Sequence, residues 1–285
     1  MRWEFGRRSS NVEDRRGGGF SGPVVGGGIG AIVLSLIVAL LGGDPSVVWD
    51  QGNVPSDRSY PESSQTQNSA SSDEMTEFVS VVLADTEDTW HSLFQQMGKT
   101  YVEPKLVLFS NGVESACGFA RSAVGPFYCP GDQKLYIDLS FYEDLKYRHQ
   151  APGDFAQAYV IAHEVGHHVQ NLLGISDQVR TLQRQVDQVE ANQLSVRLEL
   201  QADCFAGIWA HHADRSRQIL EEGDIEEALN AASSIGDDRL QRQAKGYVVP
   251  EAFTHGSSAQ RVKWFKQGIQ TGDPGQCNTF AVANP

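Results

Sequence analysis

The stretch that decides the fold is AYVIAHEVGHHVQNLLG, which runs from Ala158 to Gly174. Its apolar residues recur at helical spacing, Asp154 can cap the helix at its start, and Gly174 can close it. Three of the chain's eight histidines fall inside this apolar run. Because buried imidazole and carboxylate groups are costly without partners, the stretch predicts a buried helix that carries a polar site.

The spacing within HEVGH indicates what that site binds. His163 and His167 are four residues apart, so a helix places both rings on one face, close enough to hold one metal ion. Glu164 points to the side, toward a water on that ion, and Gly166 leaves room between the histidines. The pattern H-E-x-x-H therefore predicts His163 and His167 as zinc ligands and Glu164 as the general base of a hydrolase.

A catalytic zinc needs a third protein ligand, and RLELQADCFAGIWA (197–210) offers one. Glu199 and Asp203 are four apart on the next long helix. Their alternative reading is a solvated acidic face, but the residues around them are apolar, which favours an inward direction. We expect Glu199 to bind the metal and Asp203 to accept a hydrogen bond from a ligand histidine.

The segment FTHGSSAQR (253–261) supplies a candidate for stabilising the oxyanion. His255 comes just before a predicted capping box at Ser257–Gln260 and is the expected oxyanion partner, its alternative being a surface loop histidine. Arg261 is expected to orient Glu199 or another acidic residue near the metal. The other histidines of interest are read as supporting or structural (His168) and as exposed cations at a helix end (His211, His212).

The charge distribution indicates the setting of the domain. The chain of 285 residues has a net charge of −13, yet residues 1–16 are basic and no charge falls between Gly17 and Gly43. The apolar run 24–41 would span about 27 Å as a helix, close to one hydrocarbon thickness. A buried core helix and a cleaved signal peptide are the alternatives, but the run favours a signal anchor, with a cytoplasmic N-terminus and an extracytoplasmic domain. The acidic remainder argues against nucleic acid as a partner.

The predicted organisation follows from these segments: a basic cytoplasmic tail (1–23), a transmembrane anchor (24–42), a flexible Ser-rich linker (43–73) and a catalytic domain (74–285). Gly26 and Gly30 form a GxxxG pattern through which the membrane helix can form a homo-oligomer. Strands are expected at 105–109 and 134–139, followed by helices from residue 154 onward. The expected fold class is α+β, a small N-terminal sheet followed by a helical body.

The four cysteines allow three pairings. Cys117 and Cys129 flank a loop with Gly and Pro, which suits a local bridge and leaves Cys204 for Cys277. Free thiols and a zinc site are the alternatives, but the chain has no CxxC spacing. Two disulfide bonds are expected.

The segments HEVGHHVQNLLGI, ELQADCFAGIWA, THGSSAQR and GPFYCPGDQKLYIDLSFY closely resemble the bacterial predicted neutral zinc metallopeptidases. By its HExxH plus ExxxD pattern this family looks like the gluzincins. The resemblance implies a zincin-like domain, one Zn²⁺ per chain held by His163, His167 and Glu199, and Glu164 as general base.

Taken together, the sequence predicts a membrane-anchored zinc endopeptidase that hydrolyses peptide or protein substrates. An extended substrate is expected to pair with an edge strand at Leu135, Tyr136, Ile137 and Asp138. Two alternatives stay open: a non-catalytic zinc-containing envelope scaffold or binding protein, and a metal-dependent hydrolase of another substrate class. An intact Glu164 argues against the scaffold, because a structural zinc site has no use for a general base.

Overall fold

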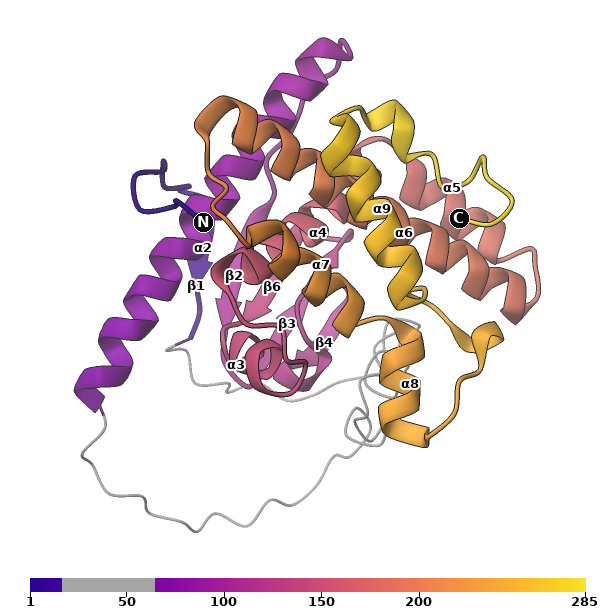
Figure 1. The fold of residues 1–285 in the computed structure, drawn as a ribbon, viewed down its shortest axis with the longest axis horizontal. Helices are drawn as coiled ribbons and strands as arrows, with labels where there is room; N and C mark the ends of the chain where they lie inside the picture. The colour runs from indigo at the N-terminus through magenta and orange to yellow at the C-terminus, as the bar shows by residue number, and fades with distance from the viewer. Residues whose placement is uncertain (17–64) are drawn as a thin grey trace.

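The computed structural model describes residues 1–16 and 65–285. Within these ranges it contains a four-stranded sheet, a two-stranded sheet and eight α-helices (Figure 1). The fold is therefore of the mixed α/β type, with the helices wrapped around one side of a small sheet.

The larger sheet has the strand order β1–β2–β6–β5. Its strands are β1 (Val12–Asp14), β2 (Lys105–Phe109), β6 (Lys134–Asp138) and β5 (Phe127–Cys129). The first three strands are parallel, and β5 runs antiparallel to β6, with Phe127 opposite Tyr136. The smaller sheet is the antiparallel hairpin of β3 (Gly112–Ser115) and β4 (Gly118–Arg121).

Alternation along the central strands buries both faces of the larger sheet. Leu106, Leu108 and Ile137 face the main core under the helices. Val107, Phe109 and Tyr136 belong to a second, smaller core that also includes side chains of the hairpin β3–β4. Because successive side chains of a strand point to opposite faces, the same short strands contribute to two cores.

The helices are α2 (Gln65–Gln96), α3 (Ser140–Tyr147), α4 (Asp154–Leu172), α5 (Ile175–Gln183), α6 (Gln188–Arg217), α7 (Asp224–Ser234), α8 (Asp237–Lys245) and α9 (Ser258–Thr271), with 3-10 turns at Ser122–Val124, Pro250–Ala252 and Pro274–Cys277. Helix α4 contacts the sheet through β5 and β6, and it also contacts α2, α6 and α7. Helices α6 and α9 cross closely: a Cβ on Gly268 would lie 1.9 Å from the carbonyl oxygen of Cys204. This tight crossing places the C-terminal half of α9 against the middle of α6.

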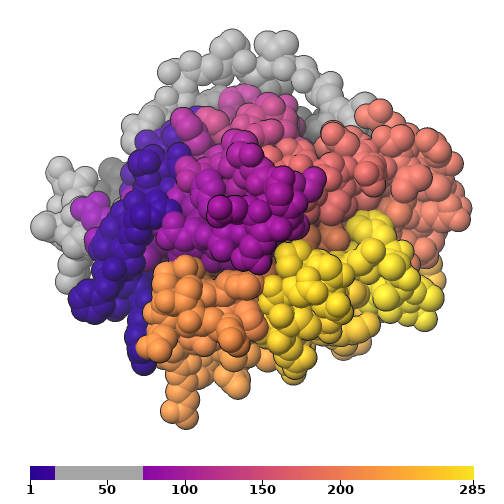
Figure 2. Space-filling model, turned by 90° about the horizontal axis from the view of Figure 1, so that it is seen from above, coloured from indigo at the N-terminus to yellow at the C-terminus, as the bar shows by residue number. Residues whose placement is uncertain are grey.

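The N-terminal residues belong to the same body as the rest of the described chain. Figure 2 shows them, in indigo, lying along α2 and the segment after α6. Ser9 donates its backbone N–H to the Ser80 carbonyl at 3.0 Å, and Arg2 donates to the Ile219 carbonyl at 2.8 Å. The amino group of Met1 lies 2.7 Å from the Asp154 carboxylate. Strand β1, which the sequence analysis did not foresee, extends the sheet beyond β2.

The buried carboxylate of Glu87 on α2 holds this N-terminal segment in place. It is only 1% exposed. The Ser9 hydroxyl donates to it at 2.6 Å, the Asn11 amide at 2.9 Å and the Arg7 guanidinium at 2.8 Å. An arginine that had suggested a cytoplasmic tail thus pairs with an acid of the domain itself.

These observations correct the predicted fold class and location. No helix in the ranges 1–16 and 65–285 is both long enough and apolar enough to cross a membrane. A zincin-like domain preceded by a transmembrane helix, and a single-pass protein whose ends lie on opposite sides of a bilayer, were therefore wrong predictions. Residues 1–16 lie against the same domain as residues 65–285. The predicted span 24–42 and its GxxxG pattern lie outside the described residues, and α2 begins at Gln65.

Candidate metal centre and active site

Helix α4 carries the HExxH residues into the centre of the molecule. Its apolar side chains are buried in the main core, and His163 and Glu164 are 6% and 8% exposed. Gly166, between the two histidines, permits a close approach to α6, because a Cβ there would lie 3.0 Å from the Ala202 carbonyl oxygen. The glycine of HEVGH therefore serves helix packing as well as the site.

Helix α6 brings Glu199 opposite both histidines. It starts at an N-cap where Asp187 accepts a hydrogen bond from the Glu190 backbone. The Glu199 carboxylate lies 3.2 Å from Nε2 of His163 and 3.5 Å from Nε2 of His167. The ligand atoms of these three residues all lie within 4.8 Å of one another. The structure thus groups the three residues that the sequence predicted as ligands.

The other ring nitrogen of His163 is held by a buried ion pair. Nδ1 lies 2.8 Å from the Asp203 carboxylate, which Arg261 binds with two nitrogens at 2.9 Å each. The Tyr159 hydroxyl also donates to Asp203. Burial alone would raise the pKa of Asp203, but Arg261 and His163 hold it below its usual range. An ionised Asp203 accepts from Nδ1–H, so Nε2 is the ring nitrogen that faces Glu199.

His167 has a separate support that the sequence analysis missed. Its Nδ1 lies 2.9 Å from Oε1 of Gln170, whose amide nitrogen donates to the Leu198 carbonyl at 2.7 Å. Because that amide is committed as a donor, Oε1 accepts from Nδ1–H and again leaves Nε2 available. Gln170 lies three residues after His167, and this spacing on one helix face was the available signal.

The electrostatics of the site favour a cation. Burial alone would lower the pKa of His163, but Asp203 and Glu199 raise it to about 10. The pKa of His167 is raised against its burial by Glu199. Burial alone would raise the pKa of Glu199, yet the neighbouring histidines hold it well below its usual value. Carboxylates held ionised in a buried site are compensated by positive charge, which protons or a metal ion supply.

A cavity of about 410 Å³ opens beside these residues. Glu164, His255 and Arg261 line it together with the three candidate ligands. Most of the remaining wall is apolar: Val124, Pro126, Phe127, Phe141, Val160, Leu198, Ile235 and Leu240. Concave, mainly apolar cavities with a few convergent polar groups are typical of ligand and active sites.

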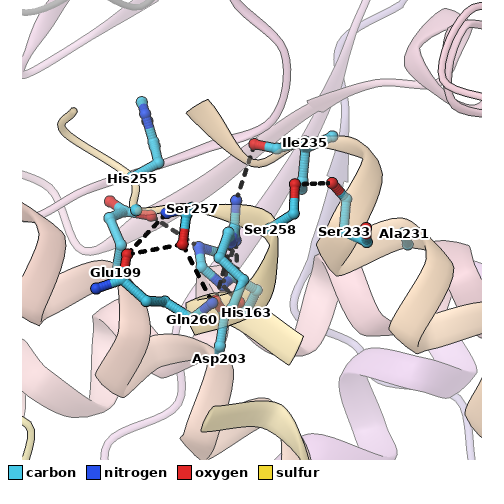
Figure 3. Close-up of polar contacts among 12 residues, drawn as sticks. His163, Glu199, Asp203, Ala231, Ser233, Ile235, His255, Ser257, Ser258 and Gln260 are labelled. Carbon is cyan, nitrogen blue, oxygen red and sulfur yellow. Dashed lines mark hydrogen bonds and ion pairs between the residues drawn. The ribbon is translucent and has the colours of Figure 1, made fainter. Parts of the chain in front are cut away.

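His255 enters the site from the loop before α9 (Figure 3). Asp237, completely buried, accepts from the backbone N–H groups of Thr254, His255 and Gly256 at 2.8, 2.7 and 3.0 Å. Its second oxygen lies 3.3 Å from Nδ1 of His255. Burial alone would lower the pKa of His255, but Glu199 and Asp237 raise it. Asp237 was absent from the sequence analysis because nothing local links it to residue 255.

The start of α9 fixes the geometry of this corner. Ser257 and Gln260 form the predicted capping box, in which the Ser257 hydroxyl accepts from the Gln260 N–H and the Gln260 side chain accepts from the Ser257 N–H. One turn of helix then carries Arg261 into the core, where it is 2% exposed. Of the two partners expected for Arg261, the structure pairs it with an acidic residue beside the metal ligands, Asp203, rather than with Glu199.

The predicted substrate strand is in the wrong place. Residues 135–138 belong to β6, which lies between β2 and β5: it pairs with β2 along its whole length and with β5 at Lys134, Leu135 and Tyr136. The edge strand beside β6 is β5, and Phe127 and Tyr128 line the cavity together with Gly125 and Pro126. Strand order is set by pairing between distant segments, and the sequence pattern of 134–139 does not contain it.

Both expected disulfide bonds are present, Cys117–Cys129 and Cys204–Cys277. The first closes the loop whose residues 124–128 form one wall of the cavity. The second ties the 3-10 turn at Pro274–Cys277 to α6, directly after Asp203.

Three further histidines have structural roles. His168 is completely buried, and burial lowers its pKa to about 4, so it is neutral. His211 and His212 lie 2.8 Å from the carbonyl oxygens of Ile269 and Gly272, respectively, at the end of α9. Within the described residues, none of the three belongs to the metal-ligating group.

Comparison with known proteins agrees with this geometry. The chain is 54% identical over 288 residues to "Uncharacterized protein YpfJ" of Escherichia coli strain K12, which covers 98% of this chain and 99% of that protein. It is 44% identical over 217 residues to "Uncharacterized protein Rv2575" of Mycobacterium tuberculosis strain H37Rv, covering 73% and 72% of the two chains. No solved structure matches. The family model described as "Putative neutral zinc metallopeptidase" matches residues 1–280, and the chain therefore belongs to that family.

Proposed function

We propose that this protein is a zinc-dependent peptidase that hydrolyses peptide bonds with a water activated by Glu164. One observation carries the proposal: two imidazole Nε2 atoms and the Glu199 carboxylate converge within 4.8 Å at the wall of a cavity that Glu164 and His255 also line.

The donor set fits zinc. Two histidine nitrogens and one carboxylate oxygen leave a fourth position open, as in catalytic rather than structural zinc sites. The Nδ1 atoms of His163 and His167 have partners on the protein side, so the Nε2 lone pairs are the ones left for a metal. When bound, zinc would lower the pKa of a coordinated water toward about 7 and polarise the substrate carbonyl.

Glu164 is the proposed general base. Its side chain follows ligand His163 directly and lines the cavity, within a largely buried environment. There it would take a proton from the attacking water and later deliver it to the amine that leaves. General acid–base catalysis of this kind typically contributes about 10²–10⁴-fold to the rate.

His255 is the proposed donor to the oxygen that becomes negative during attack. Asp237 holds the backbone on both sides of it and contacts its Nδ1. The ring can therefore present Nε2–H to the cavity without paying for reorganisation at the moment of reaction. A single preorganised donor of this type contributes about 10²–10³-fold to turnover.

An extended peptide is proposed to lie along β5, in place of the strand predicted from the sequence. This strand pairs with β6 on one side only, and its residues line the cavity. An unpaired strand edge offers main-chain hydrogen bonds to an added strand, which suits a peptide backbone as substrate.

The direct test is digestion of casein or a peptide library by the metal-loaded protein, with and without a chelator, alongside metal analysis. We expect about one zinc per chain and cleavage that the chelator abolishes and zinc restores. Glu164→Gln is the matched control, because it keeps the size of the side chain and the metal ligands. Cleavage by Glu164→Gln at the parental rate would overturn the mechanism. Metal binding without any cleavage would instead favour a zinc-containing binding protein.

A further inference from the structure

The cavity wall formed by residues 124–128 is attached to the metal-ligating helix through Tyr128. Strand β5 is only three residues long, lies at the edge of the sheet and pairs with β6 alone. Such a short edge strand is weakly fixed by its ladder. Tyr128 extends from this strand to α4, where its hydroxyl meets His168 and Asn171.

The direction of these hydrogen bonds follows from the carbonyl at their far end. Nε2 of His168 lies 2.6 Å from the Val102 carbonyl oxygen, which can only accept, so Nε2 carries the proton. Nδ1 of the neutral ring is then an acceptor, and the Tyr128 hydroxyl, at 3.0 Å, donates to it. The same hydroxyl accepts from the Asn171 amide at 3.2 Å. Every polar atom in this chain of contacts has a partner of the right kind.

We call the hydrogen bonds of the Tyr128 hydroxyl with His168 and Asn171 the tie, and its position relates it to the metal centre. His168 directly follows the candidate ligand His167, and its own ring points into the core, completely buried. Its ring packs edge-on against Tyr101 and Tyr128, which fixes its orientation. The Tyr128 side chain also lines the cavity. One residue thus belongs both to the cavity wall and to the support of the metal-ligating helix.

We infer that Tyr128 is a positioning residue that sets the width of the peptide groove between β5 and the metal centre, with His168 and Asn171 as its anchors on α4. The inference rests on the proposed function, because it requires a peptide to lie between these two elements. The tie holds the strand without touching the metal ligands: His163 and His167 take their support from Asp203 and Gln170.

The consequence is a separation between binding and chemistry. Removing the hydroxyl leaves Nδ1 of His168 without a donor and frees β5 from α4, so a smaller fraction of molecules has a groove of the correct width. The apparent affinity for substrate falls by that fraction. Bond making and breaking beside Glu164 is unaffected in the molecules that have bound. We therefore expect KM to change and kcat to stay.

The test compares Tyr128→Phe with Tyr142→Phe in the zinc-loaded protein. Tyr142 is buried, and its hydroxyl has no hydrogen-bond partner among the described residues, so this control removes an oxygen without breaking a tie. For Tyr128→Phe we expect KM for an extended peptide to rise about tenfold, as loss of a partly buried hydrogen bond allows. The kcat should stay within about twofold, with zinc content equal to that of the parent. Asn171→Ala should shift KM the same way by less.

Peptide binding gives a readout that does not depend on turnover. In the Glu164→Gln background, adding Tyr128→Phe should raise the dissociation constant of the extended peptide by the same factor as KM. The positioning role would be overturned if Tyr128→Phe and Tyr142→Phe had equal KM values. A fall in kcat at constant KM, or loss of zinc in Tyr128→Phe, would also overturn it. A parent that binds the peptide but never cleaves it would refute the proposed peptidase and still test the groove. A parent that does neither would refute both.

Discussion

Asp203 and His163, forty residues apart in the chain, form a contact of 2.8 Å that neither solvent nor any surface group can replace, because Asp203 is completely buried. Arg261 donates two hydrogen bonds of 2.9 Å to the same Asp203 carboxylate. The candidate ligand His163 is thus oriented by a carboxylate whose charge is already neutralised. Its basicity and its direction are set before any ligand arrives.

Asp203→Asn should weaken both metal binding and folding. An amide orients His163 less strongly, and partners of this kind typically contribute 10–100-fold to metal affinity. Arg261 would also lose its charge partner in the core, which costs about 3–5 kcal/mol in unfolding free energy. Zinc titration and urea denaturation measure the two effects. Asp177→Asn is the matched control, because Asp177 forms an exposed pair with Arg180 and its loss should change neither quantity appreciably.

Glu164→Gln and Glu199→Gln should separate the roles of the two glutamates. The first keeps all three candidate ligands, so zinc content is expected to stay while kcat/KM falls by about 10²–10⁴-fold. The second replaces a ligand carboxylate by a neutral amide, so zinc itself should be lost more readily. Metal analysis beside kcat/KM on one peptide decides the matter. Full zinc and full activity in Glu199→Gln would remove it from the ligand set.

His255→Ala should lower turnover while leaving the metal in place. If His255 is the donor to the developing oxyanion, kcat should fall by about 10²–10³-fold. Asp237→Asn should reduce kcat less, but it should also destabilise the loop, because Asp237 accepts three backbone N–H groups. Steady-state kinetics at full zinc loading measures both variants. A parental kcat in His255→Ala would assign the oxyanion to another group.

Glu87→Gln should release the N-terminal segment. Glu87 is 1% exposed and accepts from Arg7, Ser9 and Asn11, so the substitution leaves a partly unpaired polar group in the core. We expect a loss of about 3 kcal/mol in unfolding free energy and easier proteolysis of residues 1–16. Glu77→Gln is the control on the same helix: it pairs with Arg8, but both side chains are exposed, so its effect should be below about 1 kcal/mol. Equal losses of unfolding free energy in the two variants would contradict the role of Glu87 in holding the N-terminal segment.

Glu13 should make the sheet sensitive to acid. On β1 it bridges Lys105 of β2 and Lys134 of β6 at 3.2 and 3.1 Å. Burial alone would raise its pKa, but Arg15, Lys134 and Lys105 lower it to about 2. A depressed pKa in the folded state stabilises above the unfolded value near 4.5, and this stability is lost as the pH falls from about 4.5 toward 2.

The measurement for Glu13 is the unfolding free energy of the parent and Glu13→Gln between pH 6 and pH 2. The parent should lose about 1 kcal/mol more than the variant over this window, a value already reduced for the partial exposure of the carboxylate. Parallel curves for the two proteins would show that Glu13 does not couple folding to pH.

Local spacing was enough to predict which side chains the structure brings together at the candidate metal centre. A helix places residues i and i+4 on one face whatever surrounds it, so HEVGH and the pair Glu199 and Asp203 were readable from the sequence. Apolar neighbours gave their inward direction, and the short loop between Cys117 and Cys129 indicated one disulfide bond. These features depend only on residues that are close together in the sequence.

Tertiary structure decided everything that depends on contacts between distant segments. Asp237 beside His255 and the tie from Tyr128 to His168 arise from packing between elements, which no local period encodes. The edge strand next to the cavity is β5 and not β6, because strand order is set by pairing between distant segments. Two of the arginines predicted to face the cytoplasm, Arg7 and Arg8, instead pair with acids of α2. A charge pattern records which residues need a counter-charge, and only the fold shows whether a lipid surface or the domain itself supplies it.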